Sequence, residues 1–433
     1  MEPVRIAIVG AGNRGRGYSD YCLQHPEAGR VVAVAEPRAE FRERIVRDWD
    51  LSESRVFSDW AGLAEESCLA DAVIIATPDG MHVAPGLAFS DLGYAVLMEK
   101  PVSSDFDECR ELVATMERNG TIFAVCHVLR YTPYTRLLKR VLDEERWIGR
   151  VIGIQHLEPV GFWHQAHSFV RGNWRNTAMS SPMLLGKSCH DLDWLSYLVG
   201  SRCEAVTSFG ELLHFRPENA PAGAADRCVD CAVERDCPYS AIRIYVDRVR
   251  SGETGWPVNV LVEAPDEASV WAAIRTGPYG RCVYACDNDV VDHQVVSLRF
   301  TSGATATFTM SGFTEMRPRE TRIFGTAGEG WCDGRRVEVY SFQTGVRSVL
   351  EVEAHDGAIS SGHGGGDAGV MAAFLDAVRR GDPSGLLSGG RATLESHTMV
   401  YAAERARLED RVVRLAETLA AQLPESRVEV AAP

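Results

Sequence analysis

The segment GAGNRG at residues 10–15 constrains the fold more than any other part of the sequence. It has the G-x-G-x-x-G spacing, and it directly follows the apolar, strand-like run Val4–Val9 and opens a helical candidate. In that context the glycines permit a tight turn, close approach of a pyrophosphate and close packing of helix on strand. The helix N-terminus then offers unpaired N–H groups to the phosphates. We therefore predict a dinucleotide site that includes Gly10, Gly12, Asn13, Arg14 and Gly15.

Strand and helix signals alternate along residues 1–130. The predicted strands are short apolar runs, which is typical of strands covered on both faces. They cover residues 4–9, 31–35, 71–76, 94–98 and 121–125. Helices are predicted between them at 16–24, 38–48, 83–90 and 105–119. This alternation predicts a parallel, doubly wound sheet, so residues 1–130 are interpreted as a Rossmann domain.

The pattern changes after residue 130, and residues 131–414 are predicted to form a second α/β domain. Its later strands look alternating and antiparallel, at 295–300, 304–310, 336–341 and 348–352. Helices are predicted at 135–142, 190–199, 370–380 and 392–414. Residues from about 215 to 275 fit no regular pattern and are interpreted as an insertion without a core of its own. Residues 415–433 are predicted to be a loosely held tail.

Composition and charge limit the classes of partner. Of the 433 residues, 45% are hydrophobic and 24% are charged, a mixture typical of globular proteins. The formal net charge of −15 argues against nucleic acid, because phosphate binding requires a basic patch. No apolar run approaches the roughly 18 residues of a membrane span. Met1 to Pro3 lead into the first strand without a signal peptide, so we expect a cytoplasmic protein.

Glu36 ends the second predicted strand, about twenty residues after the glycines. A carboxylate there can accept hydrogen bonds from a ribose 2′-hydroxyl and would repel a 2′-phosphate, which favours NAD. Arg38 lies two residues further along and could bind a 2′-phosphate instead. NADP is therefore the second alternative.

Two further strand ends are predicted to reach the same crevice. Thr77, Pro78 and His82 follow one strand, and Glu99 and Lys100 follow the next. Ligands of open α/β sheets bind beyond the carboxyl ends of the strands, so all five are cofactor-binding candidates. The Lys100 ammonium could stabilise an alkoxide or exchange a proton with it. The alternative is a surface ion pair with Glu99.

Four segments occur in order over about residues 4–410: IAIVGAGNRG, ATPDGMH, EKP and CHDLDWLSYLVG. Together they resemble the Gfo/Idh/MocA oxidoreductases. The resemblance implies a Rossmann domain followed by an α/β domain with a large, mainly antiparallel sheet that often forms dimer or tetramer interfaces. It implies interconversion of a hydroxyl and a ketone on a sugar, sugar derivative or cyclitol with NAD(P). Some relatives instead hydrolyse glycosidic bonds with tightly held NAD, which is the alternative function.

The same resemblance identifies two catalytic candidates. Lys100 matches the lysine of the family's E-K-P motif, and His190 matches the histidine of its D-x-x-x-H motif. The aspartate of the second motif falls at Gly186 here, so the usual Asp–His relay is incomplete. From its place at the start of a predicted helix, His190 is expected to be neutral, because the helix dipole disfavours its charged form. A neutral imidazole can accept the proton of a substrate hydroxyl.

Several polar and aromatic residues are candidate substrate contacts. Lys187 could bind substrate or form a structural ion pair with Asp191 or Asp193. A loop rich in tryptophan and histidine precedes it, and such loops combine aromatic platforms with hydrogen-bonding groups for sugars or hold an anionic substituent. His363 is a weaker candidate. The remaining candidates are Trp163, His164, Trp174, Arg175 and His293.

The sequence RCVDCAVERDCPY places Cys228, Cys231 and Cys237 in C-x2-C-x5-C spacing. A C-x2-C pair can present two sulfurs to one tetrahedral ion, so we predict a structural zinc site in the insertion. Cys282, Cys286 or a histidine could supply the fourth ligand. The alternative is a set of free thiols, since a reducing cytoplasm disfavours a disulfide.

Overall fold

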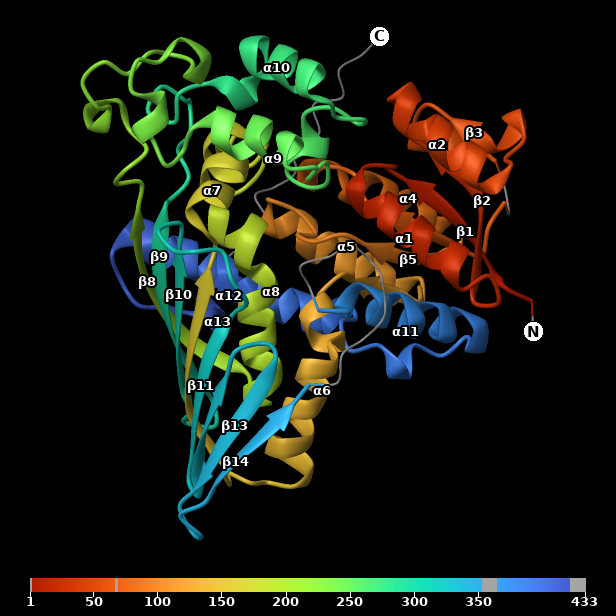
Figure 1. The fold of residues 1–433 in the computed structure, drawn as a ribbon. Coiled ribbons are helices and arrows are strands. Elements are labelled where there is room, and N and C mark those ends of the chain that lie inside the picture. Colours follow the sequence, from red (N-terminus) through yellow and green to blue (C-terminus); the bar gives the residue numbers. More distant parts are fainter. Residues whose placement is uncertain (1, 67–68, 353–363, 421–433) are drawn as a thin grey trace.

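The computed structural model describes residues 2–66, 69–352 and 364–420, so His363 and the end of the predicted tail lie outside the described residues. Its N-terminal part is a parallel sheet of six strands in the order β3-β2-β1-β4-β5-β6 (Figure 1). This order confirms the predicted Rossmann domain. The strands are β1 (Val4–Val9), β2 (Gly29–Ala35), β3 (Val56–Phe57), β4 (Ala72–Ile75), β5 (Ala95–Met98) and β6 (Phe123–Val125).

Helices cover both faces of this sheet, as its buried apolar strands require. Ile6 and Ile8 of β1 face one hydrophobic cluster, and Ala7 and Val9 face the other. The period of two along the strand thus divides the core into two layers. The helices are α1 (Asn13–Gln24), α2 (Ala39–Trp49), α3 (Trp60–Glu65), α4 (Val83–Asp91) and α5 (Phe106–Arg118).

A helix from the far end of the chain completes one of these layers. Helix α11 (Gly366–Arg380) lies against α1 and β1, and Figure 1 shows it in blue beside the red N-terminal elements. Its Met371 and Phe374 are fully buried in the same cluster as Ile6 and Ile8. The Rossmann core therefore depends on residues more than 230 positions beyond its last strand, β6.

The second domain is built on a sheet of nine strands in the order β14-β13-β12-β11-β7-β10-β9-β8-β15. Its neighbours pair antiparallel except β7 and β10, which are parallel, so the predicted mainly antiparallel sheet is confirmed. The strands are β7 (Val151–Pro159), β8 (Cys203–Glu211), β9 (His293–Phe300), β10 (Thr305–Ser311), β11 (Glu320–Gly325), β12 (Gly328–Cys332), β13 (Arg336–Ser341), β14 (Arg347–Glu351) and β15 (Val413–Arg414).

Helices lie on one face of this sheet and between the two domains. Helix α8 packs on β7 and β10, and α12 packs on α8, on β8 and on α5 of the Rossmann domain. The inner-facing residues of β10, Phe308 and Met310, are fully buried beneath them. The helices are α6 (Pro133–Lys139), α7 (Phe162–His164), α8 (Met183–Val199), α12 (Gly390–Glu409) and α13 (Leu415–Ala420).

Two predicted boundaries in this domain are wrong. Helix α8 begins at Met183, directly after Pro182, and not at His190. Proline tolerates the start of a helix but not its interior, so Pro182 was the sequence signal for this start. Helix α12 ends where Asp410 takes a left-handed conformation, with φ +48°, before β15. The first residues of the predicted tail form α13, whose Leu415 is buried.

The insertion has its own core, contrary to the expectation. Short helices, including α9 (Asp247–Arg250) and α10 (Glu267–Thr276), surround a cluster that contains Phe215, Tyr245 and Ile274. These helices are too short and too widely separated to give a clear periodic pattern in the sequence.

The outer face of the large sheet carries exposed apolar side chains. Phe209 of β8 is 63% exposed and pairs with Val295 of β9, which is 40% exposed; Val349 of β14 is 50% exposed. Among the residues that the structure describes, none of the helices has the length and hydropathy needed to span a membrane.

Replacing Phe374 with alanine tests the role of α11. We expect Phe374→Ala to lower the free energy of unfolding of the Rossmann domain by about 3–5 kcal/mol, because it leaves a cavity in a closed core. Denaturant unfolding measures this, with Leu408→Ala as the control: Leu408 is 73% exposed on α12, and its loss should cost less than about 0.5 kcal/mol. Equal stability of the two variants would contradict the packing of α11 on this core.

Candidate active site

The glycine turn between β1 and α1 has the geometry that the motif requires. Gly10 has φ +90°, and a Cβ there would lie 2.6 Å from the carbonyl oxygen of Ala76. A Cβ on Gly15 would lie 1.9 Å from the carbonyl oxygen of Gly10, so helix and turn pack closely only without a side chain. A Cβ on Gly12 would lie 3.5 Å from Nη2 of Arg38. The backbone at Gly12 and Asn13, where α1 begins, is therefore open to a ligand.

Glu36 lies at the end of β2, beside this turn, and is 2% exposed. It accepts hydrogen bonds from the backbone N–H of Ala11 at 2.8 Å and from Nε of Arg38 at 2.7 Å. Burial alone would raise the pKa of Glu36, but the hydrogen bonds from Arg38 and Ala11 outweigh it and lower the pKa. Arg38 itself is exposed and stacks on Phe41, 3.9 Å from the ring centre. Glu36 and Arg38, the two residues predicted to decide between NAD and NADP, thus form one ion pair.

Arg14 and Glu99 lie together, and their charges face each other. Nε of Arg14 donates to Oε1 of Glu99 at 2.5 Å, and Arg14 also forms an ion pair with Asp367 of α11. Tyr18 donates to the same Glu99 oxygen at 2.5 Å. These contacts join α1, the end of β5 and α11. The cofactor contact predicted for Arg14 stays a prediction, because its described partners are carboxylates and a phenol.

His82 fixes the two strand-end loops relative to each other. One of its ring nitrogens lies 2.8 Å from the carbonyl oxygen of Thr77, and the other lies 2.7 Å from that of Pro101. His82 is fully buried. The short helical turn Asp79–Met81 lies between Pro78 and His82. These residues directly follow the carboxyl ends of β4 and β5.

Lys100 reaches α8 at Gly186, one turn before His190. Nζ of Lys100 donates a hydrogen bond to the carbonyl oxygen of Gly186, at 2.6 Å. His190 lies four residues further along α8, one turn away on the same face, and is 2% exposed. The helix-terminus argument for its neutrality is wrong, because α8 begins seven residues before it. Position 186 itself faces Trp174: a Cβ there would lie 3.2 Å from Cδ1 of the indole.

A buried network of alternating charges lies behind these residues. Lys187 forms an ion pair with Glu158 of β7 at 3.1 Å, and with neither Asp191 nor Asp193. Arg319 bridges Glu158, at 3.0 Å, and Asp191 of α8. Burial would raise the pKa of Asp191, but the Arg319 guanidinium holds it well below its usual range. The sequence prediction missed Glu158 and Arg319, which come from distant segments with no motif of their own.

His164, at the end of α7, lies close to this network. Burial and the positive charge of Lys187 lower the pKa of His164 well below its ordinary value. The ring therefore stays neutral at neutral pH. It packs edge-on against Trp256 of the insertion, with 4.8 Å between ring centres. His164 is thus a neutral imidazole close to Lys187.

Trp174 joins the second domain to the loop after β4. Its Nε1 donates to Oδ2 of Asp79 at 3.0 Å, and Ser180 donates to the same oxygen at 2.9 Å. Asp79, which is only 8% exposed, was not predicted, although it lies inside the quoted segment ATPDGMH. Arg175 points elsewhere, because its Nε donates to Asp287 at 2.9 Å.

Trp163 contacts residues of the insertion, and His293 lies on the outer face of the large sheet. Trp163 packs against Trp256, with ring centres 5.1 Å apart, and lies under the guanidinium of Arg248. His293 alternates along β9 with the fully buried Gln294, so it belongs to the outer face of the sheet. The network around Glu158 lies on the inner face, and a substrate role for His293 is not supported by this placement.

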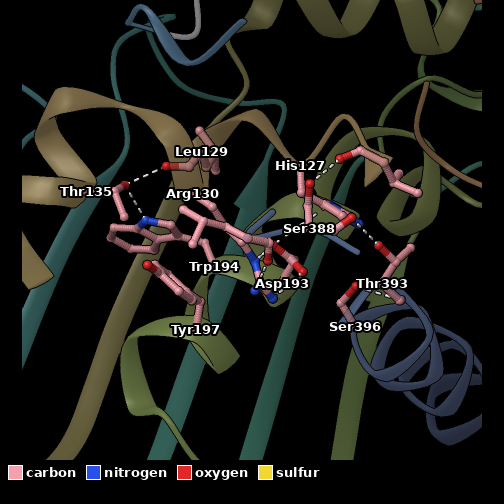
Figure 2. A network of polar contacts seen from close by, with 12 residues as sticks. His127, Leu129, Arg130, Thr135, Asp193, Trp194, Tyr197, Ser388, Thr393 and Ser396 are labelled. Carbon is pink, nitrogen blue, oxygen red and sulfur yellow. Dashed lines mark hydrogen bonds and ion pairs between the residues drawn. The ribbon is translucent and has the colours of Figure 1, made fainter. Parts of the chain in front are cut away.

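A second polar network holds α8 against the Rossmann domain (Figure 2). Arg130, just after β6, forms a bidentate ion pair with Asp193 of α8, at 2.6 and 2.7 Å. Trp194 donates from Nε1 to Thr135 at 2.8 Å. Burial lowers the pKa of the neighbouring His127 to about 4, so Arg130 is the charge that neutralises Asp193. The position of His190 relative to Lys100 is fixed by these contacts.

The predicted zinc ligands lie outside this site. Cys228, Cys231 and Cys237 line a separate cavity in the insertion. Within the described ranges, no group of three or more His, Cys, Asp or Glu side chains is arranged as a set of metal ligands. The zinc site is therefore not preformed.

Parts of this chain are similar in sequence to known proteins. A 2,7-anhydro-N-acetylneuraminate hydratase from Mediterraneibacter gnavus is 30% identical over 210 residues, and inositol 2-dehydrogenase 2 from Saccharopolyspora erythraea is 27% identical over 206. These matches cover 48% and 47% of this chain, and 53% and 56% of the relatives, so the chain spans about half the length of each.

A solved structure and two family descriptions match almost the whole chain. The structure of a levoglucosan dehydrogenase in complex with NADH and levoglucosan has a TM-score of 0.69 and 16% identity; the match covers 95% of this chain and 99% of that chain. Residues 4–127 match the oxidoreductase family with an NAD-binding Rossmann fold, and residues 141–415 match the C-terminal α/β domain of the same family. The chain belongs to the Gfo/Idh/MocA family of oxidoreductases.

Proposed function

We propose that this protein is an NAD-dependent dehydrogenase that interconverts a hydroxyl and a ketone on a sugar, sugar derivative or cyclitol. The observation that carries the proposal is the meeting of Lys100 with α8 one turn before His190, at the carboxyl ends of the Rossmann strands. An ammonium and an imidazole are suited to hold an alcohol oxygen and remove its proton. The inositol and levoglucosan dehydrogenases among the similar proteins support this class of substrate.

The residues at the glycine turn fit a dinucleotide. The open backbone at Gly12 and Asn13 binds the pyrophosphate, and the Glu36 carboxylate accepts hydrogen bonds from the ribose. NAD, when bound, supplies the acceptor for the hydride that leaves the carbinol carbon. The buried, ionised Glu36 disfavours a 2′-phosphate, so NAD is the preferred cofactor.

Lys100 and His190 have different roles at the substrate oxygen. One N–H of the Lys100 ammonium is committed to the Gly186 carbonyl, which orients the others toward the crevice. The ammonium stabilises the negative charge that develops on the oxygen. His190 accepts the hydroxyl proton, and Gly186 stands where the family motif has an aspartate. The neutral imidazole of His164 and the ammonium of Lys187 bind further hydroxyl groups of the substrate.

A redox-neutral reaction on a glycoside or anhydrosugar is the second candidate function. Two observations favour it: Gly186 replaces the aspartate of the relay, and a relative is a 2,7-anhydro-N-acetylneuraminate hydratase. In such a reaction, oxidation acidifies the adjacent C–H, elimination expels a group, and addition and reduction follow. The bound cofactor returns to its starting state.

The proposal includes a cytoplasmic homo-oligomer, a dimer or a tetramer. The exposed apolar side chains Phe209, Val295 and Val349 on the outer face of the large sheet support an interface there, since single domains seldom leave such a sheet face open to water. The net charge of −15 supports the absence of a nucleic-acid partner.

The stoichiometry of NADH separates the two functions. The protein is incubated with NAD and a panel of inositols, levoglucosan and anhydrosugars. We expect NADH, measured by absorbance, to form in proportion to the ketone product, measured by mass spectrometry. Product formed without net NADH would support the redox-neutral reaction. If neither outcome occurs on the whole panel while NAD binds, the proposed function is wrong.

Replacing Lys100 tests its role on the substrate oxygen. Lys100→Ala should reduce kcat by about 100-fold or more, because the developing charge loses its stabilising ammonium, while the Kd for NAD changes little. Lys139→Ala is the matched control, since Lys139 forms an ion pair with Asp143 and contacts α8 only near its C-terminal end, at Tyr197. An unchanged kcat for Lys100→Ala would exclude this role.

Replacing Glu36 tests cofactor preference. Glu36→Ala removes the ribose acceptor and releases Arg38 to meet a 2′-phosphate. We expect the ratio of kcat/KM for NAD over NADP to fall by about 10-fold or more, the effect of one hydrogen bond to a charged group. Arg38→Ala should shift the ratio in the opposite direction. A ratio that both variants leave unchanged would contradict the assignment.

A further inference from the structure

A cavity in the insertion is lined by cysteines from two distant segments. Its volume is about 20 Å³, and its walls include Cys228, Cys231, Cys237 and Cys282. This is room for one water-sized or ion-sized occupant. The cavity lies away from Lys100 and His190, so any function it has is separate from the proposed redox reaction.

The backbone brings the fourth cysteine to the other three. Arg227 and Arg281 form an isolated antiparallel bridge, which brings the segments of Cys228 and Cys282 together: Cys282 lies opposite Asp226, and Cys228 lies diagonally across from it. The N–H of Cys282 donates to the Asp226 carbonyl at 2.8 Å and holds this register. Cys286, the other candidate from the sequence, does not line the cavity; its thiol donates to the Cys282 carbonyl.

A backbone N–H group points at one of these sulfurs. The N–H of Ala241 donates to Sγ of Cys228, at 3.4 Å. Such hydrogen bonds stabilise thiolates and are common around metal-bound sulfurs.

A buried cation faces the same sulfurs without a carboxylate. Arg171 is 1% exposed. Its described partners are the carbonyls of Arg281 and Tyr239, at 2.7 and 2.8 Å, and Sγ of Cys228 at 3.4 Å. Its Nη1 has no hydrogen-bond partner among the described residues. A buried guanidinium requires negative charge nearby, and thiolates on the cavity wall would supply it.

We propose that Cys228, Cys231, Cys237 and Cys282 bind one structural zinc ion, with Arg171 offsetting part of the negative charge that remains on the zinc and its four thiolates. The thiols are not arranged as ligands in the described structure. Binding therefore requires them to rotate into the cavity until each sulfur lies about 2.3 Å from the ion. The small cavity favours a single ion over an iron–sulfur cluster.

Zinc at this point would connect the insertion to the substrate side of the active site. Arg171 ends the π-helical turn Gln165–Arg171, which directly follows His164. Ala166 and Val170 of that turn pack in the core of the insertion. The ion therefore positions the His164 segment and takes no part in the chemistry.

Metal analysis of the full-length chain, purified without a metal-binding tag, tests the proposal. We expect about one zinc per chain, and Co²⁺ substitution should give the visible and near-ultraviolet bands of tetrahedral thiolate coordination. Cys231→Ser and Cys282→Ser should each lower zinc affinity by at least about 10-fold. Cys286→Ser is the matched control and should keep the metal.

Three outcomes would overturn the assignment. The first is a folded wild-type chain, judged by circular dichroism and NAD binding, that holds no zinc and gives no cobalt–thiolate bands. The second is iron in place of zinc in the purified protein. The third is full zinc retention by Cys282→Ser. If the serine variants do not fold, the cobalt spectrum of the wild-type chain decides.

Discussion

The hydrogen bond between the Lys100 ammonium and the Gly186 carbonyl, at 2.6 Å, is the contact on which the candidate site depends. It joins the end of a Rossmann strand to a helix of the other domain, and so fixes where a cofactor-side cation meets a substrate-side imidazole. The ion pair of Arg130 with Asp193 also holds α8 in place, because a buried bidentate pair restricts movement of the helix along its axis. Neither domain contains a complete site without the other.

Electrostatic balance is the second organising feature of the site. Lys187 and Arg319 place two positive charges beside Glu158 and Asp191, so the buried network is close to neutral. Because the charges compensate one another, a neutral polyol can enter without meeting an unpaired buried ion. Burial and the same positive charges lower the pKa of His164, so its ring stays unprotonated.

The sequence predicted the Rossmann half well, because there each functional residue follows a strong strand signal. Gly10, Glu36 and Lys100 all lie at strand ends whose position in the sheet follows from the β/α alternation. The second half was harder, since its contacts join distant segments. No local sequence pattern indicates that Glu158 is the partner of Lys187. Helix α8 begins seven residues before the predicted start at His190, and Pro182 is the local signal for that start.

Helix α11 has a consequence for how the chain is made. During synthesis, the six strands of the first sheet emerge from the ribosome long before residues 366–380. One hydrophobic layer of that sheet stays incomplete until residues 366–380 have been translated. Until then the nascent N-terminal segment exposes apolar surface, and chains truncated before α11 are expected to aggregate.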